Sequence, residues 1–390
     1  MLRLFAAGIA IASLGAACAP KPLLEYDFDG PPQQLAVLGT PAPDDARARF
    51  RQIFCALYDA EPRSPEDDFT CDEVLHRLAG EPAATPAPLP PHDTRLRFLI
   101  ITSALGECIA DVATPFDQGV ERLEPLGYRI DTVVVGGMSS STYNAKMIAD
   151  AVEELELEPD DRLILLGYSK GAPDILHFLV GYPELAERVQ AAVSVAGAVN
   201  GSPIADGFSG VFYRWLAKPS TLFCEGRDLG MAGSLRRGHL LPWLAANPLP
   251  AHVQTFSLGA FTDKPHVARL LRIPYDLLAQ IDPRNDGQLI FTDQIVPGST
   301  LLGYANADHW AVAMALEERR SFWMGYPGRK RAFPRAVLFE AIVRFVGEDL
   351  AAGRATSRSA PSAPFVAASA SRDTGPGRPR SRAHGARRHP

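Results

Sequence analysis

Residues 96 to 199 alternate apolar runs of strand length with segments of helical periodicity, and this alternation restricts the fold more than any other feature. The apolar runs are LRFLIITSA, RIDTVVVGG, DRLILLGYS and AAVSVAGAV, and the helical segments between them are DQGVERLEPLG, NAKMIADAVEELEL and APDILHFLVG. Continuous apolar runs are typical of strands buried on both faces of a parallel sheet, and such strands need long crossover connections. The pattern predicts an α/β fold with a mostly parallel sheet flanked by helices.

The main domain is expected to span residues 94–350. Two further apolar runs, HVQTFSLGAF and GSTLLGYAN, continue the sheet, and the amphipathic segment FPRAVLFEAIVRFVGEDL closes it. Between about residues 205 and 250 the alternation breaks, which predicts a helical lid or insertion over the carboxyl-terminal edge of the sheet. Phe212, Trp215 and Leu216 in this insertion would suit an acyl chain, although such residues also form ordinary core.

Residues 1–17 have the layout of a secretory signal peptide. Arg3 precedes an apolar run from Leu4 to Leu14, and small residues follow up to Cys18. A permanent membrane span needs about 20 apolar residues, so cleavage is expected. The segment LGAAC resembles the box of bacterial lipoproteins, in which Cys18 would be lipidated, although Leu14 stands four places before the cysteine. We expect an exported protein, either a lipoprotein on the periplasmic side of a bacterial membrane or a free periplasmic or secreted protein.

Residues 18–93 are expected to form a Pro-rich and helical N-terminal extension. Helical periodicity covers DDARARFRQIFCALYDA and CDEVLHRLAG, and the proline-rich EPAATPAPLPPHD follows them. Export places Cys55, Cys71, Cys108 and Cys224 in an oxidising compartment, where four cysteines allow three pairings. A Cys55–Cys71 bond would close a short local loop and leave Cys108 with Cys224, but the sequence leaves the connectivity open.

Residues 351–390 predict a disordered basic tail. This segment has eight arginines against one aspartate, whereas the whole chain has a net charge of −6. Few bulky apolar side chains are present to offset the entropy of ordering. The tail is expected to be a solvated end or, as the alternative, to make a weak electrostatic contact with anionic lipid or polymer. No nucleic-acid partner is expected.

The segment LLGYSKGAPD places a serine between two glycines, where an apolar run meets a helical segment. A G-x-S-x-G turn between a strand and a helix holds its serine in a strained backbone conformation and exposes the hydroxyl above the sheet. This context predicts that Ser169 is a nucleophile rather than a serine in an ordinary turn. A serine hydroxyl needs a base to take its proton and a carboxylate to orient that base, and both are expected downstream.

His309 is the predicted base, because it follows the last apolar run, in STLLGYANADHW. The other histidines precede the sheet, lie on the helix after the serine, fall in or near the insertion, or belong to the tail. Asp286 is the predicted acid, in an Asn-Asp-Gly turn whose glycine permits a sharp bend. Asp263, directly after the preceding strand, is its rival, and Asp282 and Asp293 are weaker candidates.

The oxyanion of an acyl-transfer intermediate needs two backbone N–H donors. One is expected from Lys170, the residue after the serine, and the other from the loop after the first strand, at Ala104 or Leu105. The Lys170 side chain is expected to point to solvent or to form a salt bridge at the helix end.

Together these segments resemble the α/β-hydrolase family, and within it the bacterial triacylglycerol lipases and esterases, from about residue 95 to residue 350. GYSKG is similar to their nucleophile elbow, VAGAVNGSPIAD to the turn before their lid, and Asp286 with His309, 23 residues later, to their acid and base. The resemblance implies an exported serine hydrolase that cleaves carboxylic esters through an acyl-enzyme. The TSALGEC loop departs from the His-Gly of many such lipases. No metal or other cofactor is expected, since their calcium-site aspartates have no identifiable counterparts.

Two other functions stay open at this point. The chain could be a non-catalytic envelope lipoprotein that uses the hydrolase fold as a binding module. It could also be an amidase or thioesterase with the same catalytic residues, because the triad does not by itself select the bond that is cleaved.

Overall fold

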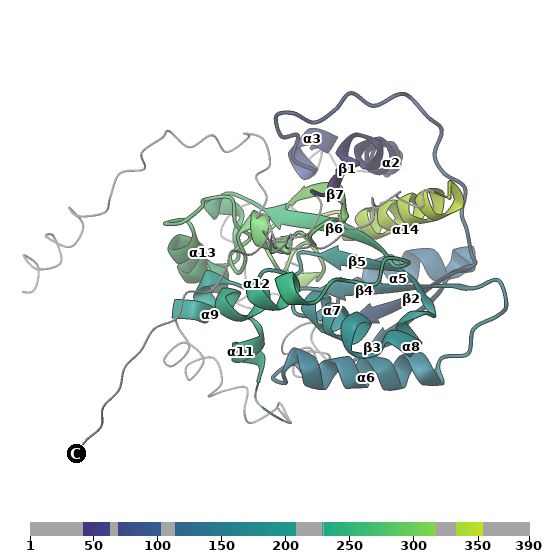
Figure 1. Ribbon diagram of the computed structural model, residues 1–390. Coiled ribbons are helices and arrows are strands. Elements are labelled where there is room, and N and C mark those ends of the chain that lie inside the picture. The colour runs from purple at the N-terminus through teal and green to yellow at the C-terminus, as the bar shows by residue number, and fades with distance from the viewer. Residues whose placement is uncertain are drawn as a thin grey trace, which may run out of the picture. The chain divides into compact units, whose positions relative to one another are not determined.

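A seven-stranded parallel sheet forms the centre of the computed structural model (Figure 1). The structure describes residues 42–62, 69–102, 114–207, 228, 230–316 and 333–353. Within these, the strand order is β1-β7-β6-β5-β4-β2-β3, and all neighbouring pairs are parallel. The α/β class and the parallel sheet expected from the sequence are confirmed. The strands are β1 (Asp44–Asp45), β2 (Leu96–Ile101), β3 (Arg129–Val133), β4 (Arg162–Tyr168), β5 (Val189–Val195), β6 (Gln254–Phe261) and β7 (Thr300–Asn306).

Helices connect most of these strands. The α6 helix illustrates how the local sequence favours these helices. Ser140 caps its N-terminus by accepting a hydrogen bond from Tyr143 N at 3.1 Å, and its buried residues Ile148 and Val152 lie one turn apart. The helices are α2 (Arg47–Asp59), α3 (Cys71–Val74), α5 (Asp117–Leu123), η2 (Glu124–Leu126), α6 (Ser141–Glu154), α7 (Gly171–Gly181), α8 (Pro183–Ala186), α9 (Pro203–Gly207), α11 (Met231–Ser234), α12 (Arg237–Ala246), η3 (Lys264–His266), η4 (Arg269–Leu271), α13 (Arg272–Leu278), η5 (Phe291–Gln294) and α14 (Arg335–Ala351).

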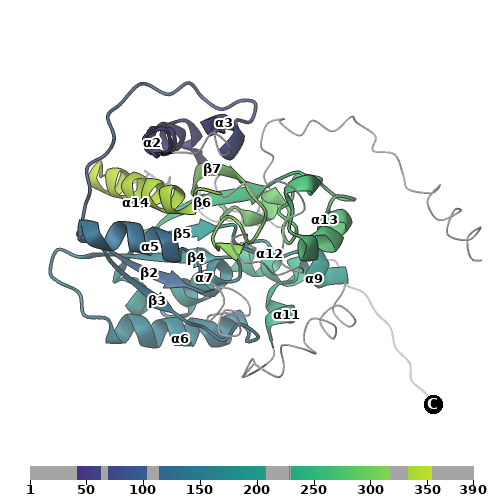
Figure 2. The ribbon, with the colours of Figure 1, turned by 180° about the vertical axis from the view of Figure 1, so that it is seen from behind.

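Both faces of the sheet are covered. Helices α5 and α14 lie on one face and α6 and α7 on the other, as the two opposite views show (Figures 1 and 2). Successive residues of β2 alternate between two apolar cores: Phe98 and Ile100 join the first face, Leu99 and Ile101 the second. The continuous apolar character of this strand follows from burial on both sides.

The described part of the N-terminal extension packs against the edge of this sheet. β1 pairs with β7, where Asp44 N donates to Ser299 O at 2.9 Å. Phe50 of α2 is fully buried and its ring meets the ring of Phe345 on α14 edge-on at 6.1 Å. Residues 44–59 therefore belong to the same apolar core as the strands after Thr94.

Two helix boundaries differ from the sequence expectation. The first helix begins at Arg47, because Asp44 and Asp45 form a strand with β7. The second helix, expected over residues 71–80, ends after a single turn. Leu75 is extended, with φ −117° and ψ 112°, and forms an antiparallel bridge with Ala305 of β7. Pairing with a strand distant in sequence outweighs the local helical pattern.

A disulfide joins Cys55 of α2 to Cys71 of α3, one of the pairings that the sequence left open. The described residues of the insertion expected over residues 205–250 include the helices α9, α11 and α12. No helix among the described residues is long and apolar enough to cross a membrane. The first three residues of the expected tail, 351–353, are described, and the first of them, Ala351, is the last residue of α14. Outside the described residues lie the signal segment with Cys18, the tail from residue 354 on, and Cys108, Phe212, Trp215, Leu216 and Cys224.

Candidate active site

Ser169 occupies a sharp turn between β4 and α7. Its φ of 54° lies in the left-handed region, which is uncommon for a residue with a side chain. A Cβ atom at Gly167 would lie 2.6 Å from Ala172 N, and one at Gly171 would lie 2.5 Å from Ile101 O. The two glycines are therefore required by the close approach of backbone, and the strained turn has the geometry expected of a nucleophile elbow.

His309 links this serine to a carboxylate. Its Nε2 lies 2.8 Å from Ser169 Oγ, and its Nδ1 lies 2.6 Å from Asp286 Oδ2. Ser169 follows β4, Asp286 lies in the loop after β6, and His309 follows β7, so the three meet at the carboxyl ends of parallel strands. The serine is 7% exposed, the histidine 2% and the aspartate 0%, so the serine is the member of this set nearest to solvent.

The carboxylate of Asp286 is held by three further donors. Its Oδ1 accepts from Gln288 N at 2.8 Å and from Leu289 N at 2.7 Å, which closes the Asn-Asp-Gly turn. Its Oδ2 accepts from Gln294 Nε2 at 3.2 Å in addition to the histidine. Gln294 is itself fixed by Ala260 at the end of β6, with N–O distances of 2.6 and 2.8 Å. These contacts compensate for the burial of the acid.

The loop that carries His309 is fixed on both sides of the imidazole. Asp308 accepts hydrogen bonds from Ala311 N at 2.8 Å and Ala268 N at 2.7 Å. The Tyr168 hydroxyl donates to His309 O, and its ring stacks on the imidazole with centroids 5.3 Å apart. Burial, with the Asp286 and Asp308 carboxylates, raises the pKa of Tyr168 well above its ordinary value, so this hydroxyl stays a neutral donor.

Of the four candidate acids, all of which are described, Asp286 is the one hydrogen-bonded to His309. Asp263 is half exposed and contacts His266 in the next helix. Asp282 accepts from Arg284 N at 2.8 Å, and Asp293 lies 3.1 Å from Arg237 on α12. The structure therefore brings together Ser169, His309 and Asp286 and leaves the rival Asp263 outside.

The side chain of Lys170 does not reach solvent, contrary to one of the two expectations from sequence. It is 1% exposed, and its Nζ lies 2.7 and 2.9 Å from the two oxygens of Asp174, which is fully buried. Asn144 Nδ2 donates to the same carboxylate at 2.7 Å. The salt bridge expected at the helix end is thus formed inside the protein. The Lys-Asp spacing of four residues was the available signal for this pair, but it does not reveal burial.

The other expected site residues are outside the described part of the chain. These are Ala104 and Leu105, named for the second oxyanion donor, and Cys18, named for lipidation. Among the described residues, no group of three or more His, Cys, Asp or Glu side chains is arranged to hold a metal ion.

Solved structures of esterases and lipases are similar to this chain. The metagenomic carboxyl esterase is 37% identical, and the match covers 87% of this chain and 99% of that chain with a TM-score of 0.72. A lipase from Bacillus licheniformis in its mature form is 19% identical over 59% of this chain and 89% of that chain, with a TM-score of 0.46. Lipase 1 from Pelosinus fermentans is 11% identical over 66% and 99%, with a TM-score of 0.42. The sequence matches no protein-family model and no curated protein.

Proposed function

The chain belongs to the α/β-hydrolase family of esterases and lipases, and from this relationship we propose that it is a serine hydrolase that cleaves carboxylic esters. The observation that carries the proposal is the chain of hydrogen bonds from Ser169 through His309 to Asp286, at 2.8 and 2.6 Å. An alcohol aligned with a base, and the base with a buried carboxylate, is the arrangement that activates a serine for acyl transfer.

In the first half of the reaction, Ser169 Oγ attacks the acyl carbonyl while His309 Nε2 takes the hydroxyl proton. The tetrahedral intermediate collapses when the histidine returns that proton to the leaving alcohol, and an acyl-serine remains. Water then attacks the acyl-serine, with the histidine again as base, and the acid is released. The serine and histidine are regenerated, so one ester and one water become one acid and one alcohol.

Asp286 sets the tautomer that this cycle requires. With its Nδ1–H donating to the buried carboxylate at 2.6 Å, the imidazole presents a bare Nε2 to the serine. The same carboxylate stabilises the imidazolium that forms when the proton moves. Its hydrogen bonds from Gln288 N and Leu289 N keep it in place.

Two backbone amides would stabilise the oxyanion. The Lys170 amide lies beside the serine at the N-terminus of α7, where the helix dipole also favours negative charge. The second donor in this proposal is the amide of Ala104, three residues beyond the end of β2 in the chain.

We propose further that the protein is exported, with residues 1–17 as its signal peptide. The support is the charged, apolar and small-residue order at the N-terminus, together with the Cys55–Cys71 disulfide, a bond typical of oxidising compartments. A mass spectrum of the mature N-terminus tests this, since diacylglycerol on Cys18 would identify a lipoprotein and an unmodified Cys18 terminus a free exported protein.

Fluorophosphonate labelling and hydrolysis of p-nitrophenyl esters of graded chain length test the catalytic proposal. Wild-type protein is expected to be labelled and to hydrolyse at least one ester, and Ser169→Ala to do neither. Folded wild-type protein that resists labelling would support the non-catalytic binding module instead. Amide and thioester analogues measured beside the best ester separate an esterase from an amidase or thioesterase with the same residues.

A further inference from the structure

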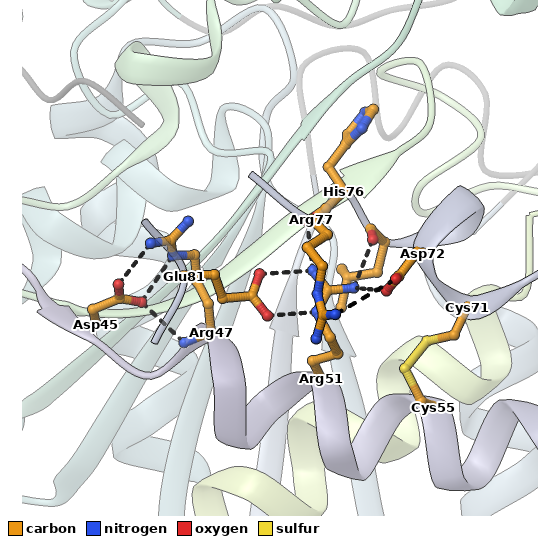
Figure 3. A network of polar contacts seen from close by, with 10 residues as sticks. Asp45, Arg47, Arg51, Cys55, Cys71, Asp72, His76, Arg77 and Glu81 are labelled. Carbon is orange, nitrogen blue, oxygen red and sulfur yellow. Dashed lines mark hydrogen bonds and ion pairs between the residues drawn. A yellow bond between two sulfur atoms is a disulfide. The ribbon is translucent and has the colours of Figure 1, made fainter. Parts of the chain in front are cut away.

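A buried arginine organises the segment that follows Cys71, the second cysteine of the disulfide. Arg51 of α2 is 5% exposed and uses all five of its N–H groups on this segment (Figure 3). Two go to Glu81 at 2.5 and 2.8 Å and one to Asp72 at 2.9 Å. The other two go to the carbonyl oxygens of Leu75 at 2.8 Å and His76 at 2.6 Å. The guanidinium therefore fixes the path of the backbone after α3.

The disulfide attaches the beginning of the same segment to α2. Cys55 lies one turn beyond Arg51 on α2 and is bonded to Cys71, the first residue of α3 (Figure 3). The capping box of Thr70 and Glu73 starts that turn. We call residues 70–76 the brace. It is attached to α2 through one covalent bond and one arginine.

The brace contacts the carboxyl ends of the two strands that precede the acid and the base. Leu75 bridges Ala305 of β7, and His76 N donates to Tyr304 O at 2.9 Å. The His76 ring stacks on Phe261, the last residue of β6, with centroids 3.9 Å apart and planes 4° apart. Its Nε2 lies 3.0 Å from Phe261 O. One short segment thus holds the last residues of both strands.

A line of hydrogen bonds continues from the brace to the active-site loops. Asn306 Nδ2 donates to Glu73 O at 2.9 Å, and Asn306 Oδ1 accepts from Thr262 Oγ1 at 2.8 Å. Thr262 N in turn donates to Asn285 O at 3.3 Å, next to Asp286 in the chain. Asn306 stands three residues before His309. The acid loop and the base loop are joined directly, where His309 N donates to Asp286 O at 2.8 Å. Thr262 and Asn306 add a second connection between the two loops, and this one also reaches the brace.

We propose that the brace sets the relative position of Asp286 and His309, with Thr262 and Asn306 as positioning residues. The Cys55–Cys71 bond holds the brace on α2. The inference rests on the proposed function. A displacement of about 1 Å between acid and base is enough to lower the rate of the chemical step about a hundredfold. Losing one of these contacts is therefore expected to reduce kcat in protein that is still folded. The contacts act on the acid and base loops, so we expect kcat to change more than KM.

The test measures kcat and KM for the best p-nitrophenyl ester in paired variants. Thr262→Val keeps the shape of this buried side chain but loses the hydroxyl, and Thr262→Ser keeps the hydroxyl. We expect kcat to fall about tenfold in Thr262→Val with KM within about twofold, and Thr262→Ser to stay within about twofold of wild type. Asn306→Ala and the Cys55→Ala/Cys71→Ala double variant are expected to show the same loss of kcat in folded protein.

Arg77→Ala is the matched control. Arg77 follows the brace and forms an exposed pair with Asp72 at 3.8 Å, so its loss should leave both constants within about twofold of wild type. If Thr262→Val does not fold, the kcat values of Asn306→Ala and of the double cysteine variant test the proposal instead. If the folded variants keep the wild-type kcat, the positioning role of the brace is wrong. Labelling of the wild-type protein would still support the proposed hydrolase in that case. A wild type that neither labels nor hydrolyses would instead contradict the proposed function.

Discussion

The Lys170 ammonium lies between the two carboxylate oxygens of Asp174, at 2.7 and 2.9 Å, inside the protein and next to Ser169. Lys170 is the N-cap residue of α7, and Asp174 lies four residues later in the first turn of that helix. The ion pair therefore spans the first turn of α7. Asn144 of α6 donates to the same carboxylate at 2.7 Å. The ion pair thus connects the backbone of the elbow to the neighbouring helix.

We expect Lys170→Met to lower the free energy of unfolding by about 3–5 kcal/mol, because it leaves the Asp174 carboxylate buried without its counter-ion. The double variant Lys170→Met/Asp174→Leu should recover most of that loss, since neither charge remains buried. Urea unfolding followed by circular dichroism measures both. A single variant as stable as wild type would show that water or another cation reaches Asp174.

The chain contains a matched pair for this measurement. Lys146 and Asp150 have the same four-residue spacing on α6, but their side chains are 63% and 55% exposed. Lys146→Met should leave the urea midpoint unchanged, because exposed ion pairs contribute little. If Lys146→Met and Lys170→Met lose similar stability, the effect at Lys170 comes from the lost side chain and not from the buried charge of Asp174.

Gly171, like Gly167, is expected to tolerate no side chain. A methyl group there would stand 2.5 Å from Ile101 O in β2, a backbone atom that cannot move aside. Gly171→Ala should cost about 1–3 kcal/mol and reduce kcat by displacing Ser169. Gly181, at the other end of α7, has open space within 4 Å of the point where a Cβ would stand, so Gly181→Ala should be neutral or slightly stabilising. Thermal melting and ester hydrolysis of the two alanine variants check this.

Asp286→Asn should lower kcat by about three to four orders of magnitude, because the amide cannot hold His309 in the tautomer that accepts the serine proton. Asp263→Asn is its control and should keep wild-type turnover, since Asp263 contacts His266 and stands apart from the base. Initial rates on a p-nitrophenyl ester decide between them. Normal turnover in Asp286→Asn with loss in Asp263→Asn would reverse the assignment of the acid.

The elbow and the parallel sheet were predictable because their signals are local. An apolar strand, two glycines around Ser169 and a helical segment follow one another in the chain, and the steric requirement at each glycine acts on backbone close in sequence or in the next strand. The position of His309 beside Ser169 was predictable for a similar reason, since the loops that follow parallel strands lie at one edge of the sheet.

The brace was not predictable, because its contacts join residues far apart in the chain. Residues 71–80 have a helical pattern, yet Leu75 pairs with Ala305, 230 residues later. The burial of Lys170 depends in the same way on Asn144 and Asp174 meeting across α6 and α7. Local propensity is a weak constraint where such long-range pairing is available.

His177 should make the folded state sensitive to acid. Its ring lies on the Trp243 ring, with centroids 3.9 Å apart, and burial, with smaller effects of His239 and Lys170, lowers its pKa from 6.5 to about 4. As the pH falls from about 6.5 to 4, the unfolded chain takes up a proton at this residue and the folded protein does not, so stability is lost across that window. The loss should reach about 2–3 kcal/mol near pH 4 and be absent in His177→Phe, which keeps the stacked ring without the titrating nitrogens. Urea unfolding at pH 7.5 and pH 4.5 measures it in both proteins, with every other titrating group as a common background. Parallel stability losses in wild type and variant would mean that His177 becomes protonated as readily in the folded protein as in the unfolded chain.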